Sequence, residues 1–67
     1  MIRLTMQGKR GKEFYLNPHM IETIECNPDT TITLLSGKIY VVAEEYSTVY
    51  NRIVEYRRSL ALSKNEE

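Results

Sequence analysis

The sequence offers few side chains that could act in catalysis or hold a metal. His19 is the only histidine, and it follows Pro18 in a predicted turn with no nucleophile, acid or second ligand at a motif spacing. We therefore interpret His19 as a solvated turn residue. Cys26 is the only cysteine, and no neighbour in sequence would stabilise its thiolate, so we expect a buried or half-buried structural thiol. One cysteine also excludes an internal disulfide and a multi-cysteine metal site.

Two further patterns resemble ligand-binding motifs only superficially. The adjacent carboxylates Glu44 and Glu45 lack the spacing and the glycine turn of a calcium loop, and we assign them to the start of a helix, where negative charge meets the positive end of the dipole. Residues 8–12, Gly-Lys-Arg-Gly-Lys, lack the strand–loop–helix setting of a phosphate-binding loop. The sequence therefore predicts a protein that is not an enzyme, with no catalytic, cofactor-binding or metal-binding residues and no small-molecule substrate.

Tyrosine and arginine, the residue types that anchor protein interfaces, supply the remaining candidates. The chain has five tyrosines. Two of them are assigned to the strand face opposite the predicted core, and a third lies among arginines on a predicted helix. The candidate partner-binding residues are Tyr15, Tyr40, Arg52, Tyr56 and Arg57. The alternative is that these side chains only cover the margins of a small core.

Charge is distributed unevenly, although the chain is neutral overall. Residues 1–12 carry a net charge of +4, residues 13–51 a net charge of −5, and residues 52–67 a net charge of +1. A pI near 6.6 argues against a dedicated nucleic-acid binder, for which we expect a value above about 9. The basic residues at 9–12 could contact RNA or an acidic partner, and the simpler interpretation is an ordinary charged loop.

Length and composition predict one modest domain. A chain of 67 residues buries only about 60% of the surface that its unfolded form exposes. Its hydrophobic content of 42% is well above the disordered range, so it should fold. The N-terminus has no apolar signal-peptide core, and no stretch approaches about 18 consecutive apolar residues. With an unpaired thiol, these features predict a cytoplasmic protein without membrane insertion.

The period of the apolar residues predicts five short strands in the first 42 residues. The expected strands lie at 2–6, 13–16, 20–26, 31–35 and 39–42. The third is the least regular, because Ile21 and Ile24 are three residues apart and strict alternation cannot place both on one face. A helical turn over Pro18–Met20, or a bulge near Thr23, would reconcile them.

The last two strands form the most clearly predicted hairpin. Ser36-Gly37 suits a two-residue turn that needs positive φ, and this turn would place Leu34 opposite Ile39. Cross-strand neighbours share a face, so this register gathers one apolar patch toward the core. The predicted patch consists of Ile32, Leu34, Ile39 and Val41. Tyr40 and Val42 would then lie on the outer face.

The period changes to that of a helix in the last third of the chain. Residues 46–62 contain neither glycine nor proline, and apolar residues recur there at helical spacing, namely Tyr46, Val49, Tyr50, Ile53 and Leu60. We expect one amphipathic C-terminal helix that lays this stripe on the sheet. The predicted fold class is α+β, a small antiparallel meander of about five strands, open or curled toward a barrel, with that helix. Residues 1–62 form the domain and residues 63–67 a frayed polar tail.

The order of turns and strands along the chain forms a recognisable pattern. Its segments are Gly11–Asn17, Ile21–Glu25, the Pro28-Asp29-Thr30 turn, the Gly37-Lys38 hairpin and Val49–Arg58. This pattern resembles the FlbD/SwrD family of small bacterial flagellar proteins, and the resemblance covers residues 1–58. It lies in the order of elements, without a catalytic motif. Where the family enters the helix through a serine cap, this chain has Glu45, a poorer cap, so Ser47 competes with it.

The resemblance implies a cytoplasmic accessory protein of bacterial flagellar motility, which in swarming-associated members raises motor power through the stator. We therefore expect a non-enzymatic protein-interaction module whose partner is a flagellar motor or stator component. A second copy of the chain is a further candidate partner, because small sheets have exposed edges. The alternative function is a small RNA-binding post-transcriptional regulator, since five strands and one helix also resemble carbon-storage-regulator proteins, and one architecture hosts many functions.

Overall fold

The computed structural model describes the backbone of residues 1–8 and 10–66 and the side chains of residues 1–8 and 10–61. The elements in chain order are β1 (Ile2–Thr5), β2 (Glu13–Leu16), a 3₁₀ turn η1 (Pro18–Met20), β3 (Ile21–Glu25), β4 (Thr30–Leu34), β5 (Ile39–Val42) and α1 (Tyr46–Glu66). All strand pairs are antiparallel. The predicted α+β class, with five strands and one C-terminal helix, is confirmed.

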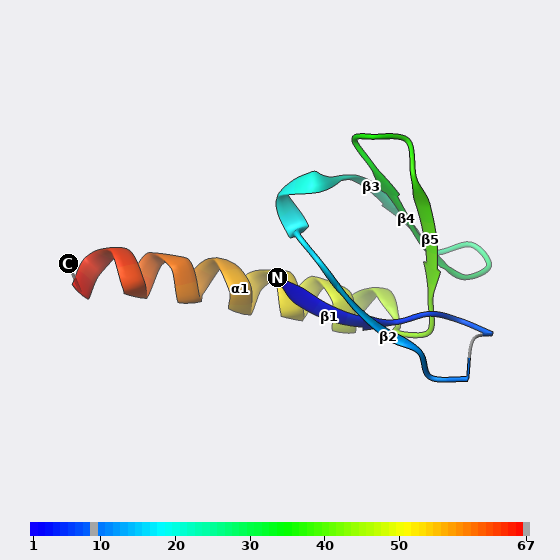
Figure 1. The fold of residues 1–67 in the computed structure, drawn as a ribbon, viewed down its shortest axis with the longest axis horizontal. Coiled ribbons are helices and arrows are strands. Elements are labelled where there is room, and N and C mark those ends of the chain that lie inside the picture. Colours follow the sequence, from blue (N-terminus) through cyan, green and yellow to red (C-terminus); the bar gives the residue numbers. More distant parts are fainter. Residues whose placement is uncertain (9, 67) are drawn as a thin grey trace.

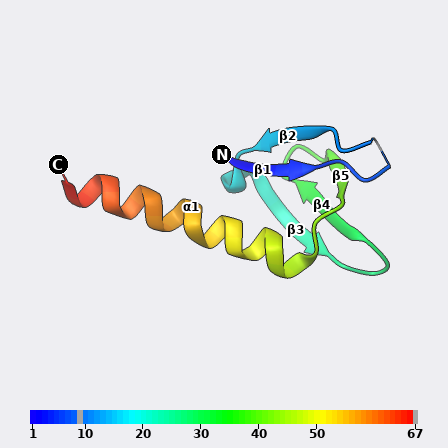
Figure 2. The same ribbon diagram turned by 90° about the horizontal axis from the view of Figure 1, so that it is seen from below.

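The strands form two sheets instead of one continuous meander. One sheet is the hairpin β1-β2, and the other has the order β3-β4-β5 (Figures 1 and 2). The break falls at η1, because Pro18 has no N–H to donate to a ladder and Asn17 caps the turn by accepting a 3.0 Å hydrogen bond from the backbone N–H of His19. The chain therefore leaves the first sheet before the second begins.

The two sheets are joined where β1 ends beside the end of β5. Met6 forms an isolated antiparallel bridge with Val42. The N–H of Gln7 donates to the carbonyl of Val41 at 3.1 Å, and the N–H of Ala43 donates to the carbonyl of Thr5 at 2.8 Å. These contacts curl the strands partway round, and the described residues form no closed barrel.

The two alternatives offered for the irregular third strand both occur. The helical turn occupies Pro18–Met20, and the register between β3 and β4 shifts between Ile21 and Thr23. Beyond the shift, Ile24 lies opposite Ile32. The bulge thus lets both isoleucines of β3 pack against the core, where each is half-buried.

The predicted register of the β4–β5 hairpin is wrong by one residue. Ile39 lies opposite Thr33, because the loop has three residues, 35–37, with Gly37 at φ +94°. The N–H of Leu34 donates to the carbonyl of Lys38 at 2.8 Å, and the N–H of Gly37 donates to the carbonyl of Leu34 at 2.9 Å, which closes a turn followed by a left-handed glycine. The slip reverses the faces of β5, so Ile39 is 62% exposed while Val42 is buried.

The core lies between the hairpin, the second sheet and the first turns of α1. Its buried members are Ile2, Leu4, Leu16, Ile32, Leu34, Val42 and Val49. Alternate residues of β1 and β4 supply it, as expected for strands with one solvated face. The predicted patch is confirmed at Ile32 and Leu34 and is wrong at Ile39 and Val41, which Tyr40 and Val42 replace.

The helix packs on the sheets only through its first half. Val49 is buried and Ile53 and Tyr56 are half-buried, whereas Leu60, on the same face, is 46% exposed. Figures 1 and 2 show α1 continuing past the strands, and the molecule measures 41 × 23 × 18 Å. The expectation that the whole stripe lies on the sheet is therefore wrong. The backbone of α1 continues to Glu66, past the predicted end at residue 62, and the side chains of the expected tail at 63–67 lie outside the described residues.

Candidate functional site

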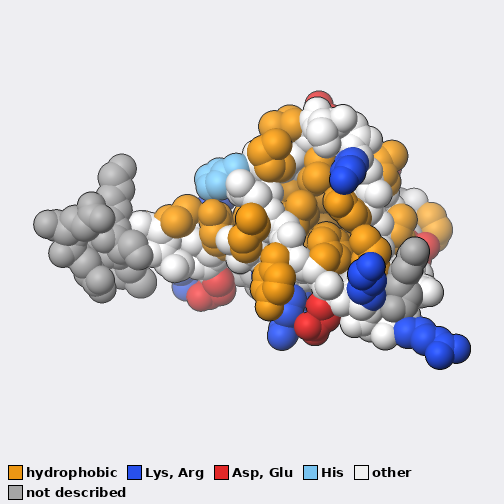
Figure 3. All heavy atoms as spheres, viewed as in Figure 1, with side chains coloured by type: hydrophobic (Ala, Val, Ile, Leu, Met, Phe, Trp, Pro, Cys, Tyr) orange, Lys and Arg blue, Asp and Glu red, His pale blue; other side chains and the backbone are white. Residues whose placement is uncertain are grey.

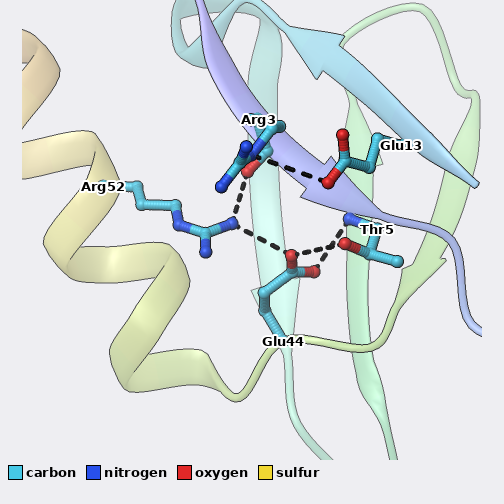
Figure 4. Close-up of polar contacts among 5 residues, drawn as sticks. All are labelled: Arg3, Thr5, Glu13, Glu44 and Arg52. Atoms are coloured by element: carbon cyan, nitrogen blue, oxygen red, sulfur yellow. Dashed lines mark hydrogen bonds and ion pairs between the residues drawn. The ribbon is translucent and has the colours of Figure 1, made fainter. Parts of the chain in front are cut away.

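A polar network ties α1 to the edge of β1. Glu44, in the link between β5 and α1, accepts hydrogen bonds from the backbone N–H and the hydroxyl of Thr5, each at 2.9 Å. Arg52 of α1 donates to the same carboxylate at 2.9 Å and also to the backbone carbonyl of Arg3 (Figure 4). The side chain of Glu44 is only 11% exposed, so the hydrogen bonds that it accepts are partly shielded from water, whereas the bond from Arg52 to Arg3 is exposed.

The network provides hydrogen-bond partners for backbone groups that would otherwise be unpaired at the edge of β1. The N–H of Met6 donates to the carbonyl of Lys12, so even-numbered residues of β1 turn their backbone toward β2. The backbone N–H and C=O groups of Arg3 and Thr5 must therefore point away from β2, on the side of α1, because these groups alternate in direction along a strand. Glu44 and Arg52 supply side-chain partners to this edge in place of a further strand, which is one way that proteins protect an edge.

The contacts of Glu44 also set its ionisation. Partial burial raises its pKa, because a charged carboxylate is less well solvated there. The hydrogen bonds from the backbone and hydroxyl of Thr5, and then the one from Arg52, outweigh that effect. The net result is that the pKa of Glu44 lies below its ordinary value of 4.5, and the group is ionised at neutral pH.

We expect the domain to lose stability in acid through Glu44. Because its pKa is lower in the folded chain than in the unfolded chain, its contribution to the free energy of unfolding is complete above pH 4.5 and is lost as the pH falls through the lower, folded pKa. Urea unfolding followed by circular dichroism, from neutral pH to below 4.5, measures this loss. Glu44→Gln should flatten the acid slope while Glu45→Gln keeps it, and equal slopes in both variants would contradict the assignment.

A groove opens beside this network, between the start of β1 and one face of α1. Its volume is about 560 Å³, which lies within the range of small-molecule sites. Met1, Ile2 and Arg3 line one wall, and helix residues between Thr48 and Ser59 line the other. The groove exists because α1 is held against β1 at Arg52 and then continues past the strands.

The predicted partner-binding residues are divided by the fold. Arg52 and Tyr56 line the groove. Tyr15 is 69% exposed on β2, and Arg57 is exposed on α1 outside the groove lining. The prediction that Tyr40 lies on the outer face is wrong, because the shifted register turns it inward, where it is half-buried and stacks on Phe14 with ring centroids 4.8 Å apart.

The other polar candidates lie apart from the groove lining. His19 is exposed in η1, as expected, and its ring meets the edge of Tyr56 with centroids 5.7 Å apart. The prediction of a buried or half-buried Cys26 is wrong, since the thiol is exposed just after β3 ends. In the basic loop, Arg10 and Lys12 are exposed, and Lys9 lies outside the described residues.

Sequence reasoning missed the role of Glu44. It grouped Glu44 with Glu45 at the start of the helix, whereas only Glu45 takes that position, its carbonyl accepting from the N–H groups of Thr48 at 3.0 Å and Val49 at 3.1 Å. Glu45 also precedes the first helical residue, Tyr46, so it stands at the cap position that the family resemblance implied. Glu44 instead bonds a residue 39 positions earlier, and no local spacing signals that contact.

Among the residues that the structure describes, no three or more histidine, cysteine, aspartate or glutamate side chains gather where they could hold a metal ion. In the same part of the chain, no helix combines the length and the apolar character needed to cross a membrane. The space-filling view shows apolar side chains over the strands and over α1 on one face (Figure 3).

The fold and the site define a small α+β domain in which a projecting helix is fixed to an edge strand and encloses a groove with it. Compared with known families, the chain matches FlbD, the flagellar and swarming motility proteins, over residues 1–61. The chain belongs to this family, and the resemblance read from the order of its segments is confirmed. No curated protein and no solved structure matches the chain significantly.

Proposed function

We propose that this protein is a non-enzymatic, cytoplasmic protein-interaction module that supports motor power during swarming by binding a flagellar motor or stator component. Its family places it in flagellar and swarming motility. The observation that carries the finer proposal is the open groove of about 560 Å³ between β1 and α1, since a groove beside a strand edge and a helix face can receive a segment of a partner protein. Arg52 and Tyr56, residue types common at binding hot spots, line it.

The geometry supports binding to a preformed surface. The bonds of Arg52 to Glu44 and Arg3 hold both walls of the groove in place before a partner binds. Binding therefore costs little conformational entropy on the side of this protein. The described outer face of the three-stranded sheet does not favour the RNA-binding alternative, because it carries threonine, glutamate and aliphatic side chains instead of the aromatic rings on which bases stack.

A charge introduced into the groove should impair swarming. Ser59→Glu places a carboxylate on an exposed helix position that lines the groove, and Ala61→Glu places the same charge on an exposed position outside the lining. We expect Ser59→Glu to reduce swarming and motor torque under load toward the level of a gene deletion, while filament number stays normal. Ala61→Glu should behave like the unmodified protein.

The measurements are swarm expansion on agar and rotation of beads attached to filaments, with the two variants produced at equal levels. Circular dichroism of both purified variants checks that each folds. Normal swarming in the deletion strain would refute the motility role, and equal swarming of both variants would refute the role of the groove.

A further inference from the structure

The geometry points to an extended peptide segment as the ligand of the groove, one that pairs with the edge of β1 at Arg3 and carries a carboxylate beside it. This inference rests on the proposed function, because it names the chemistry of the partner that the interaction module would take. It concerns the part of the β1 edge that the polar network does not cover.

At the free edge of β1, the backbone N–H and C=O groups of Arg3 and Thr5 all have hydrogen-bond partners except one. The N–H of Thr5 is bonded to Glu44, its carbonyl to Ala43, and the carbonyl of Arg3 to Arg52. The N–H of Arg3 points to the same side, because the ladder with β2 uses the even-numbered residues, and no hydrogen bond from it is found among the described residues. An unpaired strand N–H is a template for another strand, which is the basis of β-strand addition in peptide recognition.

The groove lies where such a strand would run. Arg3 and its two preceding residues form one wall, and the helix face ending at Ser59 forms the other. Arg52 closes the groove toward Thr5 by bonding both Arg3 and Glu44, so pairing is limited to a short stretch at the beginning of β1. A segment of a few extended residues therefore fits the edge, and a long added strand does not.

Charge determines which extended segment the site favours. Arg3 lines the groove, and among the described residues its only ionic contact is with Glu13 at 3.9 Å, a long and exposed pair that contributes little. The other charged side chains of the groove already have partners, Arg52 with Glu44 at 2.9 Å and Glu55 with Arg58 at 3.5 Å, so Arg3 is the cation with the weakest ionic contact. A residue paired with Arg3 would place its side chain on the same face as the guanidinium, so a glutamate or aspartate there is favoured.

The test is a titration of the ¹⁵N-labelled full chain, monitored by amide chemical shifts, with acetyl-Thr-Val-Glu-Val-Thr-amide as the probe. The Arg3 amide and those of the groove-lining helix residues should shift together. A matched probe with lysine in place of glutamate should bind about fivefold more weakly, the upper range for one exposed ion pair.

Two substitutions of Arg3 separate the contribution of its backbone N–H to peptide binding from the contribution of its side chain. Arg3→Ala removes the guanidinium with its aliphatic stem and keeps the edge N–H, whereas Arg3→Pro also removes that N–H. Proline is tolerated on an edge strand here because the N–H is not part of the β1–β2 ladder. Arg3→Pro should bind the glutamate probe about fivefold more weakly than Arg3→Ala, the value of one hydrogen bond. Unchanged β2 amide shifts in both variants show that the hairpin is intact.

Several outcomes would overturn the inference. They are equal affinity of the two probes, equal affinity of the two variants, shifts away from Arg3, and the same shifts with sodium glutamate alone, which would indicate a free anion. Shifts at Arg3 on raising the protein concentration without peptide would make a second copy the occupant. If the inference fails while Ser59→Glu still impairs swarming, the proposed function stands and only the binding mode is lost.

Discussion

Leu4→Ala is expected to unfold most of the protein at growth temperature. Leu4 is completely buried at the centre of β1, where the hairpin, the second sheet and α1 meet. Truncating a buried leucine to alanine costs about 2–5 kcal/mol through lost burial and the cavity left behind. A core in a chain this short rarely supplies more than about 3–5 kcal/mol in total, so the loss is comparable with the whole stability.

Urea unfolding monitored by far-ultraviolet circular dichroism measures the effect. The matched control is Leu35→Ala, the same substitution in the β4–β5 loop at a side chain that is 61% exposed, and its free energy of unfolding should change by no more than about 0.5 kcal/mol. Similar losses in the two variants would mean that Leu4 does not occupy the core as described.

The sequence predicted the local elements well because their signals are local. The alternation of Ile2 and Leu4 with polar residues indicated β1. The irregular spacing of Ile21 and Ile24 indicated a helical turn or a bulge, and the structure has both. The start of α1 at Tyr46 also followed from the change of period. In each case the residues that form the element are the same residues that signal it.

The β4–β5 register was not predictable from the pattern alone. Both faces of β5 are apolar, with Ile39 and Val41 on one and Tyr40 and Val42 on the other, so alternation does not say which pair faces the core. The loop decides it, and Leu35-Ser36-Gly37 adopts a three-residue turn although Ser36-Gly37 also suits a shorter one. The assignment of Tyr40 to the outer surface failed for this reason.

Long-range contacts set the limits of prediction for the groove as well. Arg52 and Tyr56 were recognised as interface residue types, and both line the groove. The sequence did not indicate that the start of β1 forms the other wall of the groove. Contacts between β1 and α1 join residues about 49 positions apart, as in the bond from Arg52 to Arg3. The distance to which α1 extends past the strands also depends on tertiary packing, which no helical period specifies.

Glu44→Ala is expected to release α1 from the edge of β1. The substitution removes the acceptor of the Thr5 N–H and one of the two acceptors of the Arg52 guanidinium, at a carboxylate that is only 11% exposed. An unsatisfied, shielded donor costs about 1–3 kcal/mol, and more where a charged group loses its partner. The loss should therefore be several times that of Glu45→Ala, which removes the same charge from the exposed neighbouring side chain.

A double-mutant cycle assigns the loss to the network. If Glu44 and Arg52 act through their 2.9 Å contact, Arg52→Ala should cost much less in the Glu44→Ala background than in the unmodified chain. The free energy of unfolding in urea gives the stability term, and amide exchange of Thr5 reports the edge directly, since its N–H should exchange faster once Glu44 is removed. Additive losses, or slow exchange at Thr5 in the Glu44→Ala variant, would show that other contacts hold the helix and form the groove.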